Sequence, residues 1–378
     1  MNISDADRAN IERLRNAYKL FTFQLTPYYD TDFNLLRWLQ GHENNFEIIV
    51  PKLKNHLLLR KSKLKLDELA DRQRNHPVHH HWKCGITGPA LVTPNAIVNI
   101  EQTGSNDFWG MLQTYSSHEV FKARVLDLET MLRAVMEMEE KTGEQASVIY
   151  VMDLSNLSYN KRLISLMTGP MSSISSFMSE HYVELVHTSF AKPLIPEKTR
   201  NKVKIFGSNW RQEMLKLAVP EVLPAFWNEP NSNVFKADVE RAVPLDPKNY
   251  YVFKELENME TLSIPPGKVD FFATKGDEGQ VLSWTIVTDG NFGYALYWTN
   301  DEKETDVTKM EKIFPGFMKV PGPTKVPIKD DLICEKTGFY KLWISNEHAW
   351  FHTLRISCNF FASSAITPSD YTTTLVNS

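Results

Sequence analysis

The sequence predicts an α/β domain followed by an all-β sandwich, and three observations predict this order. The chain has 378 residues, which is long for one domain and sufficient for two separate cores. Up to about residue 228, stretches with apolar residues every three or four positions alternate with short apolar runs, as in helices packed on a sheet. Beyond residue 249 the apolar period falls to two, which indicates antiparallel strands.

We expect five segments along the chain. The stretch before residue 248 is rich in proline, so it continues neither helix nor strand and is predicted to be a linker. The last residues are rich in serine and threonine and are predicted to be disordered. The segments are a helical head (1–70), an α/β domain with a mixed sheet and covering helices (71–228), the linker (229–248), the β-sandwich (249–362) and the tail (363–378).

Three helices are expected in the head. The second begins after Thr31, whose hydroxyl is a good N-cap, and ends near Gly41. The third spans about 46–60, and Pro51 is expected in its first turn, where a missing N–H is tolerated. The apolar stripe of the first helix consists of Ile11, Leu14, Tyr18, Phe21 and Leu25.

The α/β domain is predicted from a strand–helix–strand succession. A strand is expected at 96–102, and a long amphipathic helix at 118–141 is expected to end at Gly143. The run at 147–154 is apolar at successive positions, which is typical of a strand covered by helices on both faces. A second long amphipathic stretch follows at 163–186.

The strands of the sandwich are marked by alternation. Runs 281–287 and 292–298 each place their large apolar residues on one face and are joined by Thr-Asp-Gly-Asn, a hairpin-type turn sequence. Runs 339–345 and 350–357 repeat this design. Several short strands with turn signals predict a sandwich.

Composition limits the classes of function. The chain is 42% hydrophobic and 23% charged with a net charge of −4, so it has no basic excess for binding nucleic acid. Its cysteines, Cys84, Cys334 and Cys358, are odd in number and form no CxxC motif, which suits a reducing, cytoplasmic compartment. Neither a secretory signal nor an apolar run of about 18 residues is found, so we expect membrane contact to be peripheral.

Five motifs follow one another along the first part of the chain, and they are DFNLLRWLQGHENNF, VMDLSNLS, EHYVEL, KPLIPEKTRNKVKIFGSNW and LPAFW. In this order they resemble the CRAL-TRIO lipid-transfer family. The later motifs IPPG, LSWTIVTDGNFGYALYW and CEKTGFYKLWISNEHAWFH resemble the GOLD β-sandwich that some animal members carry behind that domain. Because the motifs cover nearly the whole chain, the sequence resembles a CRAL-TRIO protein with a C-terminal GOLD domain.

The resemblance implies a hydrophobic pocket for one lipid, closed by a mobile helix at the membrane surface, with neither a cofactor nor catalytic turnover. The expected function is to carry or sense a phospholipid or other hydrophobic ligand at cytosolic membrane surfaces. Each candidate pocket residue also has a purely structural interpretation. The apolar candidates could be ordinary core residues, and the two charged candidates could form a surface ion pair. The candidate pocket residues are Tyr150, Met152, Phe177, Met178, Tyr182, Glu184 and Lys202.

Two departures from the family bear on the ligand. Members that hold phosphatidylinositol place small hydroxyl residues where this chain has Val148 and Tyr150, so an inositol phosphate is not the favoured ligand. The chain also passes directly from HTSF (187–190) to AKPLIPEKT (191–199), which leaves the domain shortened near residue 190. A strand is nevertheless expected at 202–207. We expect the shortening to affect a central strand and the gate helix.

Three other interpretations remain open. The histidines at 76, 79, 80 and 81 raise the hypothesis of a metal site, because imidazole nitrogen is a common zinc ligand. Adjacent side chains diverge, however, and no cysteine or acidic residue completes a ligand set nearby in the sequence. The serines at 172–179 with Asp153 raise a hydrolase hypothesis, which lacks a GxSxG elbow. Finally, the sandwich is a candidate adaptor for a membrane-trafficking protein, with Trp284, Trp298, Trp343 and Trp350 as possible anchors.

Overall fold

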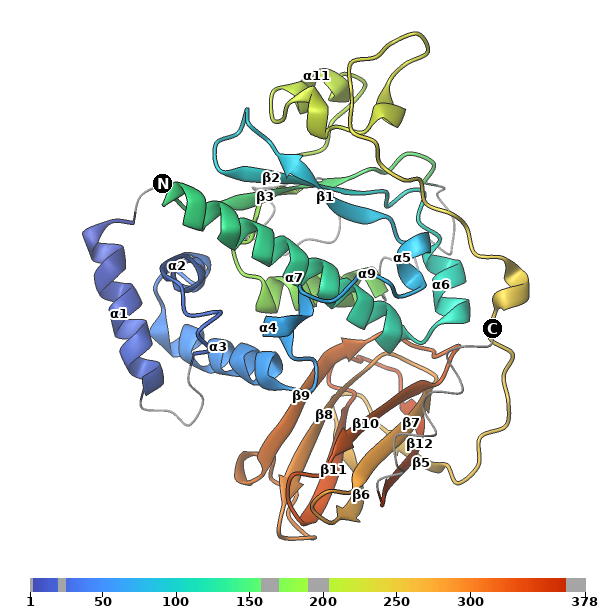
Figure 1. The fold of residues 1–378 in the computed structure, drawn as a ribbon. Helices are drawn as coiled ribbons and strands as arrows, with labels where there is room; N and C mark the ends of the chain where they lie inside the picture. The colour runs from blue at the N-terminus through green and yellow to red at the C-terminus, as the bar shows by residue number, and fades with distance from the viewer. Residues whose placement is uncertain (1–2, 20–24, 158–169, 190–203, 365–378) are drawn as a thin grey trace. The chain divides into compact units, whose positions relative to one another are not determined.

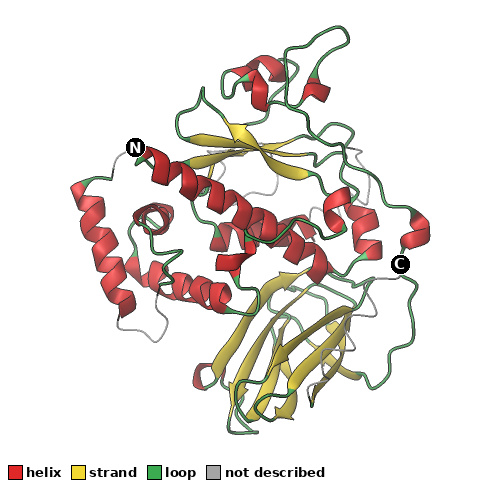
Figure 2. Cartoon of the chain, viewed as in Figure 1, coloured by secondary structure: helices red, strands yellow, loops and turns green. Residues whose placement is uncertain are grey.

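The computed structural model describes residues 3–19, 25–157, 170–189 and 204–364 (Figure 1). Contacts divide the chain into two compact units, one of residues 1–115 and 119–250 and the other of residues 116–118 and 251–378. The first unit contains helices and a mixed sheet, and the second is built from antiparallel sheets (Figure 2). The predicted succession of an α/β part and an all-β part is therefore confirmed.

The N-terminal helices follow their sequence signals closely. The Thr31 hydroxyl accepts a hydrogen bond from the Asn34 N–H at 3.1 Å, as expected of an N-cap. Pro51 is one exception, because it is the sixth residue of its helix and lies in the second turn rather than the first. Leu25 is another, because α1 ends at Lys19 and Leu25 lies outside a helix, while Phe21 lies outside the described residues. The helices are α1 (Asp5–Lys19), α2 (Asp32–Gly41), α3 (Phe46–Lys61) and α4 (Leu66–Leu69).

The sheet of the first unit has the strand order β1-β2-β3-β4. The pair β1/β2 is antiparallel, and β2/β3 and β3/β4 are parallel. Gly143 has φ +68° and ends α7, as predicted. The elements are α5 (Val78–His81), β1 (Cys84–Pro89), β2 (Ala96–Glu101), α6 (Phe108–Thr114), α7 (Ser117–Thr142), β3 (Ser147–Met152), α9 (Pro170–His181), β4 (Val186–Ser189) and α11 (Trp210–Leu215).

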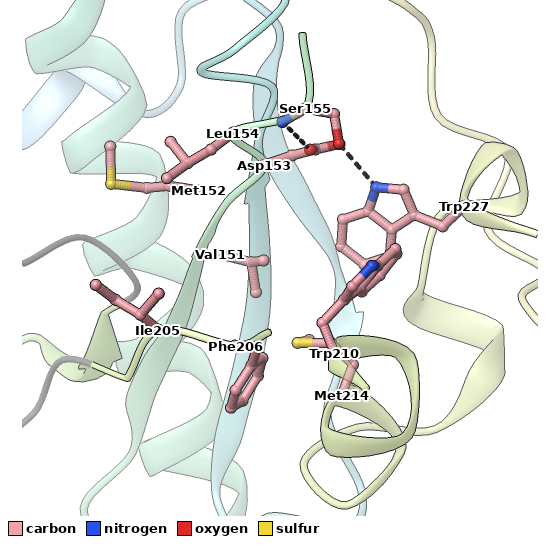
Figure 3. Close-up of a pocket in the computed structure, with 10 residues that line it drawn as sticks. All are labelled: Val151, Met152, Asp153, Leu154, Ser155, Ile205, Phe206, Trp210, Met214 and Trp227. Carbon is pink, nitrogen blue, oxygen red and sulfur yellow. Dashed lines mark hydrogen bonds between the residues drawn. The ribbon is translucent and has the colours of Figure 1, made fainter. Parts of the chain in front are cut away.

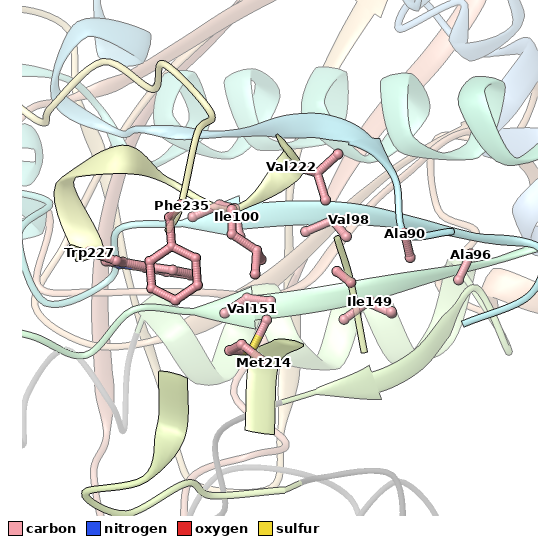
Figure 4. Packing of buried hydrophobic residues seen from close by; sticks show 12 residues of the cluster. Ala90, Ala96, Val98, Ile100, Ile149, Val151, Met214, Val222, Trp227 and Phe235 are labelled. Carbon is pink, nitrogen blue, oxygen red and sulfur yellow. The ribbon is translucent and has the colours of Figure 1, made fainter. Parts of the chain in front are cut away.

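Alternation along the central strands separates two buried faces. Ile149 and Val151 of β3 belong to an apolar cluster that includes Trp227 and Phe235 (Figure 4). Tyr150 points to the opposite face, where its hydroxyl contacts Arg124 of α7. Both faces of β3 are therefore covered, and its four central residues are buried, as the continuous apolar run predicted.

The region of the expected shortening differs from the sequence prediction in one respect. Residues 204–207 are irregular, so the described part of the strand expected at 202–207 is not a strand. Val186–Ser189 does form β4, which pairs with β3 through a register irregularity. Only 14 residues (190–203) separate β4 from Lys204, and residues 190–203 lie outside the described ranges.

The proline-rich segment predicted as a linker is part of the first unit, which extends to Tyr250, and it contributes buried side chains to it. The side chains of Phe235 and Leu245 are 1% and 5% exposed. Asn228 Oδ1 accepts hydrogen bonds from the backbone N–H groups of Val234 and Phe235. Three short 3₁₀ turns punctuate the stretch that contains this segment, and they are η1 (Pro220–Val222), η2 (Ala225–Trp227) and η3 (Pro247–Asn249).

The second unit is a pair of four-stranded antiparallel sheets, with orders β10-β7-β12-β5 and β6-β11-β8-β9. The turn Thr-Asp-Gly-Asn joins β7 and β8, which belong to different sheets, so it is not a hairpin. The strands are β5 (Glu260–Ile264), β6 (Val269–Gly276), β7 (Val281–Thr288), β8 (Phe292–Thr299), β9 (Glu311–Val320), β10 (Ile328–Ile333), β11 (Gly338–Ser345) and β12 (Leu354–Ser363), with the 3₁₀ turn η4 (Val307–Lys309) before β9. Within the described ranges, every helix of the protein is too short or too polar to cross a bilayer.

Candidate functional site

A cavity of about 220 Å³ lies beside the C-terminal end of β3 (Figure 3). The strand contributes Val151, which faces Trp210 and Met214 of α11 across the cavity. The wall is mostly apolar, and such walls favour apolar ligands or ligand parts. The further lining residues are Met152, Asp153, Leu154, Ser155, Ile205, Phe206 and Trp227.

One carboxylate, that of Asp153, lines the cavity and is engaged by neighbouring groups. Its Oδ2 accepts a hydrogen bond from Trp227 Nε1 at 2.8 Å, and its Oδ1 accepts one from the Ser155 N–H at 2.9 Å. The Trp227 ring is itself packed edge-on against Trp210, with ring centroids 5.1 Å apart. The carboxylate therefore orients the aromatic wall of the cavity.

The rim of the cavity is apolar and open to solvent. Ile205 is 60% exposed and Leu154 is 40% exposed, although both are large aliphatic residues. Exposed apolar side chains at the mouth of a cavity favour the passage of an apolar group from one non-aqueous environment to another.

The hydrogen bond between Trp227 and Asp153 gives a first prediction. Replacing Trp227 with phenylalanine removes the donor and leaves a partly buried carboxylate with one fewer partner. We expect the free energy of unfolding to fall by about 1.5–3 kcal/mol, the usual contribution of a hydrogen bond to a charged group. Urea denaturation measures it, and Trp210→Phe, which makes the same exchange on the neighbouring ring, is the control. Equal losses for the two variants would show that Asp153 is not the cause.

Of the apolar residues that the sequence singled out for the pocket, the structure places one at the cavity wall and the other four beside α7. Met152 lines the cavity, whereas Tyr150 lies on the other face of the sheet. Met178 also lies on that face, with its sulfur 3.9 Å from Arg124. Phe177 and Tyr182 lie 6.1 Å apart, ring to ring, at the C-terminal end of α9.

Glu184, the one charged candidate within the described ranges, does not line the cavity. Glu184 is half-buried with φ +56° between α9 and β4. Lys202 lies outside the described residues, so the proposed pairing of these two side chains stays a prediction.

The cavity residues that sequence analysis missed carried a weak signal. Trp210 and Trp227 belong to the motifs GSNW and LPAFW, which marked the family resemblance but received no role. Alternation showed that β3 has two faces, but both faces are apolar. Periodicity therefore could not indicate which face adjoins a cavity.

The histidines of the metal hypothesis and the Asp153 carboxylate of the hydrolase hypothesis bind other partners in the structure. His79 Nε2 lies 3.3 Å from the Ala123 carbonyl oxygen, whereas His81 Nδ1 lies 2.6 Å from that of Val243. Within the described ranges, no group of three or more potential ligands could hold a metal ion. The Asp153 carboxylate, in turn, binds Trp227 and Ser155 rather than a histidine.

Comparisons with known proteins agree with the domain order. Residues 97–228 match the CRAL/TRIO domain model. Residues 247–366 match the model F28H7_8_C, described as a "-like, C-terminal domain". A similar protein is the CRAL-TRIO domain-containing protein F28H7.8 of Caenorhabditis elegans, 25% identical over 355 residues that cover 86% of this chain and 84% of that protein.

One solved structure, titled "Crystal structure of Sfh5", is similar with a TM-score of 0.45 and 15% identity. The match covers 64% of this chain and 93% of that chain. The C-terminal match does not name a GOLD domain, although that part is rich in sheet, so the GOLD assignment stays a prediction. The predicted CRAL-TRIO domain is thus found as a match of residues 97–228 to the CRAL/TRIO domain model, and this segment contains both the strand β3 and the aromatic wall of the cavity.

Proposed function

We propose that this protein binds a lipid through its α/β unit and transfers or presents it at membrane surfaces, without catalysing a reaction. The cavity between β3 and α11 is the observation that carries the proposal. It lies inside the segment that matches the CRAL/TRIO domain, its wall is mostly apolar, and its rim exposes Ile205 and Leu154. A site of this composition stabilises an apolar group by removing it from water.

The cavity favours the apolar part of a ligand over a charged headgroup. Its described wall includes one carboxylate, Asp153, and no lysine or arginine. An inositol phosphate buried there would lack the positive charge and donors that offset its desolvation. At about 220 Å³ the space is below the roughly 300–1,000 Å³ of ordinary ligand pockets. We infer that it accepts one acyl segment or a compact apolar lipid.

The positions that the family uses for phosphatidylinositol support the same inference. Val148 and Tyr150 are buried on the face of β3 that packs beneath α7, away from Val151 and the cavity. Their side chains therefore have no access to a ligand beside Trp210.

We further propose that the β-sandwich is of the GOLD type and targets the protein to membranes or to trafficking proteins. The sheet-rich architecture and the motif order support this assignment. The alternative function, a non-lipid-binding adaptor, uses the sandwich alone. A chain without residues 251–378 distinguishes the two functions, because a lipid carrier keeps its ligand and an adaptor loses its partner.

Native mass spectrometry after incubation with mixed liposomes tests the lipid proposal. We expect the wild type to retain one lipid and Val151→Phe to lose it, because the larger ring fills the cavity. The same exchange at Val92, which is 45% exposed in the β1–β2 loop, should leave binding unchanged. A wild-type protein that stays empty with every lipid mixture would refute the proposal, and equal binding by Val151→Phe would refute the assignment of the site.

A further inference from the structure

The loop between β11 and β12, residues 346–353, carries two adjacent aromatic side chains in solvent. Trp350 is 87% exposed and Phe351 is 93% exposed, which are the highest values among the large apolar residues of the described ranges. A single exposed apolar residue is ordinary, but two adjacent aromatic rings with almost no covering indicate an interaction site.

The base of this loop is fixed although its tip is exposed. The buried Asn346 side chain donates hydrogen bonds to the carbonyl oxygens of Ile264 at 2.9 Å and His352 at 2.8 Å. The Asn346 backbone N–H donates to Lys268 O at 2.9 Å, and its carbonyl accepts from Gly267 N–H at 3.1 Å. These hydrogen bonds fix the base of the loop that carries the aromatic tip. Binding through the tip should therefore cost little conformational entropy in the loop.

The strand registers show which loops share this end of the sandwich. Ile264 pairs with Leu354, Val269 with Ser345, and Phe292 with Val320. The loops at 265–268, 289–291 and 321–327 therefore lie at the same end as the aromatic tip.

Three cations lie at the same end of the sandwich as the tip. Lys268, Lys325 and Arg355 are exposed there. Three carboxylates are exposed at the same end, and each accepts a hydrogen bond. Asp289 binds His352 at 3.0 Å, Glu347 accepts from the Ser345 hydroxyl at 2.9 Å, and Asp270 accepts from the Phe271 N–H at 2.8 Å. This end of the sandwich thus combines an apolar point with three exposed cations, in a balanced set of charges whose carboxylates all accept hydrogen bonds.

We propose that the Trp350–Phe351 tip inserts into the interface of a phospholipid bilayer that contains anionic lipid. Two aromatic side chains offer roughly 300–500 Å², below the roughly 800 Å² that each partner buries in a specific protein interface. A fluid bilayer accepts such a small convex tip without a matching groove. Tryptophan prefers the headgroup level, and basic residues are attracted by anionic lipids.

This inference does not require a lipid in the cavity, so it can fail or succeed independently of the proposed function. The cavity lies in the α/β unit and the tip in the β unit. Loss of vesicle binding with retained lipid, or the reverse, separates the two proposals.

Flotation with vesicles of phosphatidylcholine mixed with phosphatidylserine tests the inference on the full chain. We expect Trp350→Ala with Phe351→Ala to weaken vesicle binding roughly ten- to hundredfold, which corresponds to about 1.4–2.8 kcal/mol. Lys268→Gln with Arg355→Gln should weaken it roughly fivefold per charge and should have no effect with phosphatidylcholine alone. The control is Phe253→Ala, an aromatic residue of the same unit that is 63% exposed outside the loop.

Three results would overturn the inference. The wild type could fail to bind vesicles of either composition, or the double alanine variant could bind as the wild type does. Alternatively, the wild type could form a dimer that only the double variant loses, in which case the tip binds a second copy of the chain. Because both side chains are exposed, the thermal midpoint of the double variant should match that of the wild type, which excludes misfolding as the cause.

Discussion

Replacing Arg124 with methionine is expected to lower the free energy of unfolding by about 3–5 kcal/mol. Arg124 is 2% exposed on α7, and its guanidinium lies 3.7 Å from the carboxylates of both Glu101 and Asp127. It also donates hydrogen bonds to the Tyr150 hydroxyl and to Cys84 Sγ. Without the cation, the buried Glu101 carboxylate loses its ion-pair partner, whereas Asp127 keeps Arg74 at 2.7 Å. An uncompensated buried charge is strongly destabilising.

A matched control lies on the same helix. Arg133 pairs with Asp71, but the two side chains are 28% and 66% exposed, so Arg133→Met should cost less than about 1 kcal/mol. Urea denaturation monitored by circular dichroism measures both variants. Similar losses at the two positions would contradict the argument.

The pH dependence of the Arg124 variant follows from Glu101. Burial raises the pKa of the Glu101 carboxyl above its ordinary value, and Arg124 opposes that rise. A raised pKa in the folded state means that stability is present at low pH and is lost as the pH rises through that pKa. The stability deficit of Arg124→Met should therefore shrink on acidification, and adding Glu101→Gln should recover part of it at neutral pH.

A histidine pair between α3 and α9 is expected to destabilise the first unit below pH 6.5. His56 Nδ1 and His181 Nδ1 lie 3.2 Å apart, and both rings are buried. Burial, with Lys52 and Arg60 nearby, lowers the pKa of His181 to about 3. Burial, Arg60 and His181 lower the pKa of His56 well below its ordinary value.

The sign follows from proton uptake by the unfolded chain. The unfolded histidines bind protons near pH 6.5 while the folded ones stay neutral, so stability is present above pH 6.5 and is lost as the pH falls. Each histidine contributes about 1.4 kcal/mol per pH unit, or roughly 2 kcal/mol between pH 6.5 and pH 5. The nearby Glu129 carboxyl has a pKa that burial raises, which acts in the opposite direction.

Comparison of variants isolates the histidine contribution. Between pH 6.5 and pH 5, the free energy of unfolding of His56→Gln should fall less steeply than that of the wild type. The two slopes should differ by about 1.4 kcal/mol per pH unit, which corresponds to one proton. The exposed His80 is the control, and His80→Gln should keep the wild-type slope. Parallel pH profiles for the wild type and His56→Gln would show that His56 is not the sensor.

The parts of the fold that sequence analysis predicted depend on short-range signals. The N-cap at Thr31, the stop at Gly143 and the α1 part of the predicted apolar stripe (Ile11, Leu14 and Tyr18) depend on residues within one or two helical turns, so they can be predicted from adjacent residues. Pro51 shows the limit of this reading, because α3 continues through it in the second turn.

Features set by distant residues were harder to predict. Whether Lys204–Gly207 forms a strand depends on a neighbouring strand to pair with, not on its own sequence. The cavity wall joins Val151 to Trp210 and Trp227, which are separated by more than fifty residues of sequence. Local periodicity identified the candidate residues on β3 but could not place the wall opposite them.

The change of sheet at the β7–β8 turn has a consequence for folding. Among the described strands of the β unit, only β8 and β9 are both paired and consecutive in the sequence, and every other pair joins strands that are not neighbours along the chain. Early hairpins therefore offer little nucleation, and the ordering entropy of long loops must be overcome before most ladders form. We expect the β unit to fold slowly and in one cooperative step, since the chain alternates between the two sheets and neither sheet can be completed before the other has begun to form.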